Sequence, residues 1–315
     1  MGTYVITGGA SGIGAAISQQ LQSEGHRVLV VDIQQADIVA DLATAAGRCA
    51  AIDAVRDATG GALNGLVACA GIGSHIPNRQ LITAVNYFGA VELVEGLRQT
   101  LADNRAPVLL VSSNSAPMPT NPDYVEALLS GDETAANALA DHMEPQSVYS
   151  GSKQALSRWM RRNTADYAAQ GIRMNALAPG YTKTPLSAAV EDDPRYGEAI
   201  RQFIDSIPMG RAGLPWDMAD AASVLLGDRA SLIGGAVLVF EGGRDDLLGR
   251  DPDALVDHFH PAITRANCDL LRAVGVAVQT RLADKKLDPA TQSVAGRVDS
   301  RAHLRQFLHH SCAGS

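Results

Sequence analysis

The chain has 315 residues, of which 46% are hydrophobic and 19% are charged, and its formal net charge is −8. This length can bury a sizeable core, and the acidic balance argues against a nucleic-acid partner, which would favour a basic surface. The four cysteines show no CxxC or metal-ligand spacing, which indicates reduced thiols.

The first apolar run starts near residue 3, in "MGTYVITGG", and leaves no room for a signal peptide. No apolar run approaches the roughly 20 residues that are needed to cross a bilayer. We therefore expect a cytoplasmic protein without a membrane partner.

Apolar runs bounded by turn residues recur along the chain and alternate with segments of helical periodicity. The runs are 4–9, 27–33, 65–71, 107–113, 172–180 and 236–243, and the helical segments include 13–25, 79–104, 148–170 and 215–227. Buried strands that alternate with helices predict an α/β fold, a doubly wound parallel sheet of the Rossmann type in one domain over residues 1–243.

Three places depart from this alternation. Between Asp32 and a candidate strand at 37–42 there are too few residues for a crossover helix, so a loop or turn is expected there. Residues 114–147 form a long polar insertion with helical character. The tail at 244–315 follows the last strand, and its pattern predicts helices around 261–283 and 301–310. It could be an oligomerisation arm, a lid or a loosely ordered extension.

A glycine-rich loop, "TGGASGIG" at 7–14, follows the first strand and opens a helix. Glycines at 8, 12 and 14 permit a tight turn and the close approach of a pyrophosphate to backbone N–H groups at the helix N-terminus. Such a loop can also be a turn without a ligand.

Asp32 ends the second strand, where a carboxylate would accept hydrogen bonds from the adenosine ribose and repel a 2′-phosphate. This favours NAD over NADP, although the carboxylate could instead cap a turn. Asp41 and Leu42 close the next strand and could flank the adenine.

Tyr149 and Lys153 lie four residues apart and share one face of a helix. An ammonium one turn away favours the phenolate, so we expect it to lower the tyrosine pKa toward the range of an acid/base catalyst. Ser112 and Ser113 end a strand at the sheet edge where ligands bind, and a hydroxyl there can steady a substrate oxygen. Asn86, on the helix at 79–104, could kink that helix or anchor a proton-relaying water.

In this order, these motifs resemble those of short-chain dehydrogenases/reductases over residues 3–243, with "CAG" at 69–71 and "PGYTKT" at 179–184 completing the set. The resemblance implies Tyr149 as catalytic acid/base, Lys153 as ribose ligand, Ser113 as the serine that positions the substrate and Asn86 as relay support. It implies a cofactor site made of Gly8, Ser11, Gly12, Ile13, Gly14, Asp32, Asp41, Leu42, Ala70, Gly71, Tyr149, Lys153, Pro179, Gly180, Thr182 and Thr184.

Two residues depart from the family pattern, Cys69 in place of an asparagine and Glu241 in place of an aspartate. The missing crossover helix and the insertion resemble the bacterial 3α-hydroxysteroid dehydrogenase/carbonyl reductase branch, which implies a hydrophobic secondary alcohol or ketone as substrate, such as a steroid or terpenoid. Residues 185–212 lie where a substrate lid is expected. Its apolar residues could line the substrate or only pack helices: Leu186, Tyr196, Ile200, Phe203, Ile204 and Met209.

The histidines of the tail, at 258, 260, 309 and 310, lack ligand partners at metal-binding spacing, so no metal is expected. The family resemblance implies a homo-oligomer, and because the insertion precedes the helix with Tyr149, we expect a dimer. Two other functions stay open, a 3-oxoacyl thioester reductase and a non-catalytic NAD-binding regulator; Asp32 argues against the first and the complete Ser-Tyr-Lys set against the second.

Overall fold

The computed structural model describes residues 1–191 and 197–243, in which seven parallel strands form one sheet. The strands lie in the order β3-β2-β1-β4-β5-β6-β7, and every pair is parallel, which confirms the predicted doubly wound α/β fold. Their bounds are β1 Thr3–Thr7, β2 Arg27–Asp32, β3 Ile38–Val39, β4 Gly65–Ala68, β5 Val108–Val111, β6 Met174–Pro179 and β7 Val237–Phe240.

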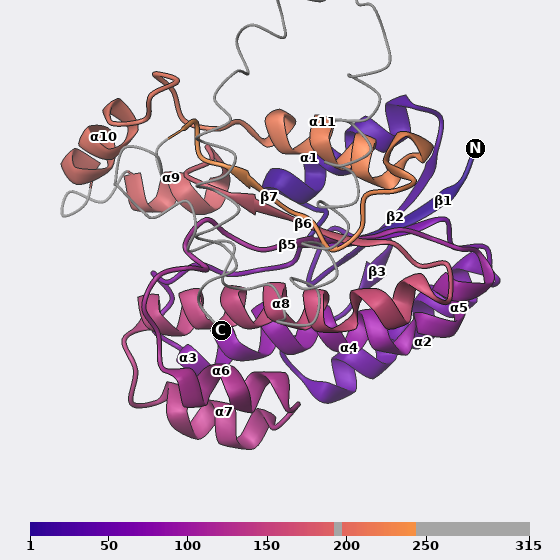
Figure 1. The fold of residues 1–315 in the computed structure, drawn as a ribbon, viewed down its shortest axis with the longest axis horizontal. Helices are drawn as coiled ribbons and strands as arrows, with labels where there is room; N and C mark the ends of the chain where they lie inside the picture. Colours follow the sequence, from indigo (N-terminus) through magenta and orange to yellow (C-terminus); the bar gives the residue numbers. More distant parts are fainter. Residues whose placement is uncertain (192–196, 244–315) are drawn as a thin grey trace, which may run out of the picture. The chain divides into compact units, whose positions relative to one another are not determined.

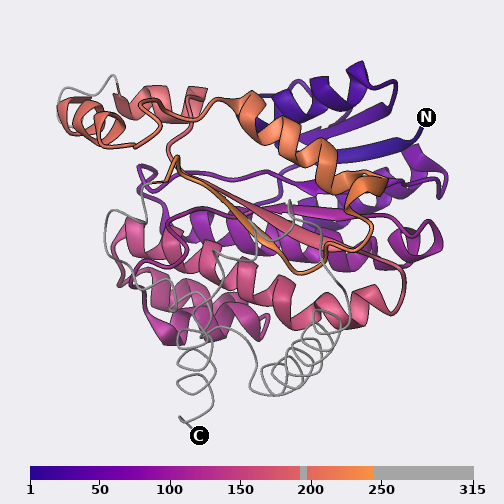
Figure 2. The same cartoon turned by 45° about the horizontal axis from the view of Figure 1, so that its top comes forward.

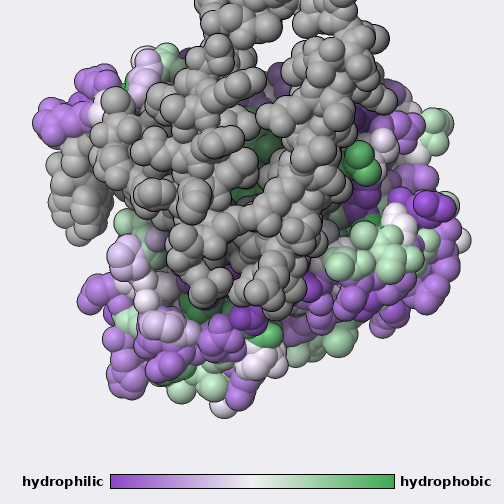
Figure 3. All heavy atoms as spheres, viewed as in Figure 1, coloured by the Kyte–Doolittle hydropathy of each residue, from purple (hydrophilic) through white to green (hydrophobic). Residues whose placement is uncertain are grey.

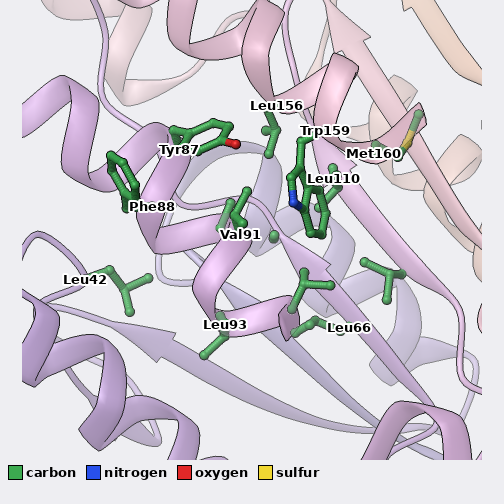
Figure 4. Close-up of a cluster of buried hydrophobic side chains, with 14 of the residues drawn as sticks. Leu42, Leu66, Tyr87, Phe88, Val91, Leu93, Leu110, Leu156, Trp159 and Met160 are labelled. Atoms are coloured by element: carbon green, nitrogen blue, oxygen red, sulfur yellow. The ribbon is translucent and has the colours of Figure 1, made fainter. Parts of the chain in front are cut away.

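Helices cover both faces of the sheet (Figures 1 and 2). On one face lie α1 (Gly12–Ser23) and α11 (Pro215–Leu226), which pack against each other. On the other face lie α2 (Ala45–Thr59), α4 (Gly89–Gly96) and α8 (Pro145–Ala168). Each face has its own apolar cluster, and Figure 4 shows part of the larger one, where Trp159 and Leu156 of α8 meet Leu110 of β5. Burial of these apolar side chains is what fixes the helices on the sheet.

No helix joins β2 to β3, as the spacing predicted. Strand β3 has only two residues, shorter than the predicted 37–42, because its exit turns at Asp41 to enter α2. The carboxylate of Asp37 accepts a hydrogen bond from the backbone N–H of Val30 at 2.8 Å. This bond holds the short connection against β2.

The segment predicted as helical at 79–104 is helical over nearly all its length, but it is divided into four successive pieces. These are α3 (Arg79–Thr83), a π-helical turn η1 (Ala84–Phe88), α4 and α5 (Arg98–Asp103). A π-helical turn adds only one residue to a helix. Such a small change is not visible in the hydrophobic periodicity of the sequence. Asn86 lies inside this turn.

The insertion forms two short helices, α6 (Pro122–Leu129) and α7 (Glu133–Ala140), outside α8 and α3. The side chains of Asn121 and Asp132 cap their N-termini, and Gly131 turns the chain between them with a φ of +76°. Inside the insertion Tyr124 is fully buried and shares a 2.9 Å hydrogen bond with Thr83. The surface on this side of the molecule is mostly hydrophilic (Figure 3).

After β6 the chain forms α9 (Pro185–Glu191) and α10 (Gly197–Asp205) within the segment predicted as a lid. No helix among the described residues is long and apolar enough to span a membrane. The helices predicted in the 244–315 tail, and the tail histidines, lie outside the described residues.

Candidate active site

The strand order reverses between β1 and β4, which opens a crevice at the carboxyl ends of the strands. A cavity of about 1470 Å³ occupies this edge, more than the volume usual for one small ligand. Every residue predicted to contact the cofactor lines it, from Gly8 on β1's exit to Thr184 before α9, and Ser113 does too. The fold therefore gathers the predicted set into one place, whereas Asn86 stands behind the cavity wall.

The glycine loop packs so closely against its neighbours that no side chain fits at Gly8 or Gly14. Gly8 has a φ of +69°, and a Cβ on it would lie 2.7 Å from Cα of Ala70. A Cβ on Gly14 would lie 2.2 Å from the carbonyl oxygen of Gly8. The Thr7 hydroxyl accepts hydrogen bonds from the backbone N–H groups of Cys69 and Ala70, at 3.1 and 3.0 Å. These contacts lock the exits of β1 and β4 together.

The N-terminus of α1 faces the cavity with the donors that a phosphate needs. Ser11 and Gly12 line the cavity, and the side chain of Ser11, the N-cap, makes no capping hydrogen bond. The first N–H groups of a helix have no partners within the helix and carry a partial positive charge. The residues present thus fit the pyrophosphate of a dinucleotide.

The position of Asp32 is compatible with both roles considered for it, as a ligand of the adenosine ribose and as a cap of a turn. Its Oδ2 accepts a hydrogen bond from the Ala10 N–H at 3.1 Å, and Oδ1 accepts one from the Ile33 N–H at 2.7 Å. The carboxylate therefore holds the glycine loop, yet it lines the cavity, and each oxygen can still accept a bond from a ribose hydroxyl.

The two serines that end β5 point in different directions, as consecutive residues at a strand end do. The Ser112 hydroxyl lies 3.1 Å from the Lys153 carbonyl oxygen and 2.8 Å from Ser157 Oγ, and so ties β5 to α8. The Ser113 hydroxyl lies 3.0 Å from Ser115 Oγ, and it interacts with the phenol of Tyr149 closely enough to oppose the rise in the pKa of that tyrosine. Of the two serines, Ser113 is therefore the one that faces Tyr149.

The expectation that Lys153 lowers the pKa of Tyr149 is wrong in this structure. Burial raises the pKa of Tyr149, and the opposing effect comes from the nearby Ser113 hydroxyl. Burial also lowers the pKa of Lys153 to about 8, and its ammonium donates a 2.8 Å hydrogen bond to the carbonyl oxygen of Val111. Removal from water disfavours both charged forms, which the sequence spacing could not reveal.

Asn86 uses its side chain to hold the loop that follows β4. Its Oδ1 accepts a hydrogen bond from the Ile72 N–H at 2.8 Å, and its Nδ2 donates one to the Ile72 carbonyl at 3.0 Å. A π-helical turn surrounds Asn86, and the kink suggested for this helix stays a prediction. The relay role of Asn86 stays a prediction.

Cys69, which departs from the family pattern, is a half-buried residue of the cavity wall near Lys153. Burial raises the pKa of Cys69 to about 12, so the thiol is neutral. Its backbone N–H keeps the bond to Thr7, so the substitution leaves the link between β1 and β4 in place.

Sequence reasoning missed the polar residues at the cavity mouth. Gln146, one turn before Tyr149 on α8, accepts a 2.7 Å hydrogen bond from the Ser74 hydroxyl and donates one to Ser150 at 3.2 Å. His75 lies beside them in the cavity wall. The three-residue spacing of Gln146 and Tyr149 was the signal that could have found the first of these.

Of the apolar lid residues, three line the cavity, namely Leu186, Ile200 and Phe203. Ile204 and Met209 are not among the lining residues, and Tyr196 lies outside the described residues. Within the described part of the chain, no group of three or more histidine, cysteine, aspartate or glutamate side chains could hold a metal ion.

Residues 8–245 match the family model described as enoyl-(acyl carrier protein) reductase. The chain belongs to this family, the short-chain dehydrogenases/reductases, and is an NAD(P)-dependent oxidoreductase acting on CH–OH groups.

Particular relatives cover the same part of the chain. It is 39% identical over 255 residues to a 3-alpha-hydroxysteroid dehydrogenase/carbonyl reductase of Comamonas testosteroni, covering 79% of this chain and 98% of the relative. It is 33% identical to a cis-4-hydroxycyclohexanecarboxylate dehydrogenase of Sinomonas cyclohexanicum, covering 76% and 94%. The crystal structure of the 3-alpha-hydroxysteroid dehydrogenase from Pseudomonas sp. B-0831 complexed with NADH superposes with a TM-score of 0.75 at 45% identity, covering 78% and 98%.

We predict that Gly14→Ala removes dinucleotide binding, because its Cβ would displace the Gly8 carbonyl and with it the loop. NADH affinity, measured by fluorescence titration, should fall at least about tenfold, which is about 1.4 kcal/mol. Gly234→Ala is the matched control, since its Cβ would meet only Thr164, at 3.9 Å. Unchanged NADH affinity in the Gly14 variant would contradict the assignment of the loop.

Proposed function

We propose that this protein is an NAD-linked dehydrogenase that interconverts a hydrophobic, steroid- or terpenoid-like secondary alcohol and its ketone. The observation that carries the proposal is that the Ser113 hydroxyl and the Tyr149 phenol line the same cavity as the glycine loop, with Ser113 close enough to oppose the rise in the pKa of the phenol. Two hydroxyls that meet beside a dinucleotide site can hold one substrate oxygen between them. The named relatives, two of them hydroxysteroid dehydrogenases, support the substrate class.

In this mechanism Tyr149 exchanges a proton with the substrate oxygen. Bound NAD supplies the chemistry of a hydride acceptor, and its reduced form that of a donor. When a ketone is reduced, the neutral phenol gives its proton to the carbonyl oxygen, and in alcohol oxidation the phenolate takes the hydroxyl proton. The Ser113 hydroxyl donates to the oxygen as negative charge develops on it.

Lys153 is held where it can act on the cofactor. Its bond to the Val111 carbonyl fixes the ammonium at the end of β5, and its remaining N–H donors can reach ribose hydroxyls. Asn86, Ser113, Tyr149 and Lys153 are thus our proposed catalytic and supporting residues.

The preference for NAD over NADP rests on charge. Asp32 lies at the end of β2 with its carboxylate on the cavity, and Lys153 is the only lysine or arginine among the described lining residues. A 2′-phosphate near Asp32 would meet a negative charge without a nearby cation. The NADH complex of the Pseudomonas relative is consistent with this preference.

The preference for a hydrophobic substrate rests on the cavity wall beyond the catalytic groups. Half-buried apolar side chains line it from the loop after β4 and from α3, η1 and α10: Ile72, Leu81, Val85, Ile200 and Phe203. Such surface favours an apolar ring skeleton over a sugar, because its burial releases water from apolar area on both partners.

A 3-oxoacyl thioester reductase is the second candidate, since the matching family model bears an acyl-carrier reductase description. The two candidates differ in cofactor, because biosynthetic reduction usually draws on NADPH. We predict that NADH binds at least about tenfold more tightly than NADPH and that Asp32→Ala narrows the difference, in parallel fluorescence titrations. Tighter NADPH binding by the wild type would favour the thioester reductase.

We predict that Ser113→Ala lowers kcat by about 10²- to 10³-fold, the effect of losing one donor to a developing oxyanion. The matched variant Ser112→Ala loses contacts within the fold and should cost about 1 kcal/mol of unfolding free energy with a much smaller change in kcat. Tyr149→Phe should bind NADH and show no turnover. The assay is nicotinamide absorbance with cyclic secondary alcohols and steroids, and equal losses in the two serine variants would contradict the assignment.

We predict that only the oxidation direction depends on pH between pH 6 and 8. Because the pKa of Tyr149 is raised, the phenolate is scarce at neutral pH, and kcat/KM for alcohol oxidation should rise about tenfold per pH unit between pH 6 and 8. Reduction uses the neutral phenol and should stay level over that range, below the pKa of about 8 of Lys153. An oxidation profile that levels off below pH 7 would show that the phenol is not held neutral.

A further inference from the structure

Arg48 on α2 is a buried cation outside the catalytic groups. Its side chain is only 1% exposed. A buried guanidinium is tolerated only when hydrogen bonds and opposite charges satisfy it, so its partners mark a strongly fixed arrangement.

Those partners come from three other parts of the chain. Nε donates to Glu92 of α4 at 2.7 Å, and Nη2 donates to Glu133 of α7 at 2.6 Å. Nη1 lies 3.4 Å from both the second oxygen of Glu133 and the backbone carbonyl of Leu42. The guanidinium also lies 5.8 Å from the centroid of the Phe88 ring. One side chain thus links α2, α4, the insertion helix α7 and the exit of β3.

Leu42 is part of the cavity wall on the side of Asp32. β2 and β3 pair Asp32 with Val39, and the Ala40 N–H donates to the Asp32 carbonyl at 2.9 Å. The segment from Ala40 to Leu42 therefore continues the cavity from Asp32, the end proposed for the adenosine half.

The position of Leu42 is tightly confined. A Cβ on Gly89 of α4 would lie 3.2 Å from the Leu42 Cβ, and a Cβ on Gly47 of α2 would lie 2.0 Å from the Asp41 carbonyl oxygen. Figure 4 shows Leu42 at the edge of the buried cluster, on the side of Phe88. Because α2 and α4 lie this close, the hydrogen bond from Arg48 to the Leu42 carbonyl oxygen holds this part of the cavity wall from the side away from the cavity.

We propose that Arg48 is a positioning residue for the adenine end of the cofactor site, and that Glu133 makes the insertion a structural part of that site. The inference rests on the proposed dinucleotide function of the cavity. The insertion then does not only pack against α8. The carboxylate of its Glu133 also orients the Arg48 guanidinium, which bonds the Leu42 carbonyl oxygen.

The test compares two glutamates of the insertion, each paired with an arginine. Glu133 is paired with buried Arg48, whereas Glu126 is paired with Arg162 at 3.2 Å in a bridge whose side chains are 56% and 59% exposed. Exposed pairs contribute little. Glu133→Ala should weaken NADH binding by about tenfold, within the range seen for residues that act through a network, and Glu126→Ala should leave it unchanged.

Inhibition by AMP, which contains only the adenine half of the cofactor, shows which end of the cofactor site a substitution affects. In Glu133→Ala and in Arg48→Lys, the inhibition constant of AMP should rise by the same factor as the NADH dissociation constant. kcat at saturating NAD should stay within about twofold of wild type, and Glu133→Gln, which keeps an acceptor, should recover most of the affinity.

Three results would overturn the inference. The first is a lowered melting temperature in Glu133→Ala and Arg48→Lys with unchanged NADH and AMP affinities, which would make the network purely structural. The second is weaker NADH binding with unchanged AMP inhibition, which would put the effect at the wrong end. The third is a folded wild type that binds no NADH, which would remove the proposed function as well.

Discussion

The site depends on the two bonds that the Thr7 hydroxyl accepts from the backbone of Cys69 and Ala70. Parallel strands β1 and β4 must separate at their carboxyl ends for a crevice to exist, since the chain leaves toward opposite faces there. Thr7 limits that separation, and Gly8 fills the remaining space with backbone alone. The glycine loop is therefore held in register with the sheet, and its position relative to α8, which carries Tyr149, follows from this register.

The catalytic helix is fixed to the same sheet by groups that do no chemistry. Ser112 bonds α8 from β5, and Lys153 reaches back to the Val111 carbonyl. The insertion between Ser113 and Tyr149 adds two further links, because Thr120 donates to the Ser147 carbonyl at 2.8 Å and Gln154 donates to the Ala116 carbonyl at 3.0 Å. A long insertion at this point is compatible with catalysis because it returns to α8 on both sides of Tyr149.

Local patterns in the sequence predict the strands, the glycine loop and the missing crossover helix. These features are set by residues within one turn or one strand. The π-helical turn within 79–104 was missed because it changes the period by only one residue, and the hydrogen bonds between Asn86 and Ile72 that accompany it are tertiary contacts. Arg48 meets partners 44 and 85 residues away, and no periodicity in one sequence encodes such pairs. The direction of the Tyr149 pKa was missed for a related reason, since spacing gives neighbours but not burial.

Burial changes how the Tyr149 and Lys153 pair should be understood. An exposed pair would gain by ionising the phenol beside the ammonium, but in this cavity desolvation opposes charge on both groups. The resting state is then a neutral phenol beside the Ser113 hydroxyl and a lysine whose pKa is lowered to about 8. In the proposed mechanism, a substrate oxygen that becomes negative would receive a proton already present on Tyr149, whereas the reverse reaction would first have to create a phenolate. Burial therefore favours, at neutral pH, the protonated form of Tyr149, which is the form that the proposed ketone reduction uses.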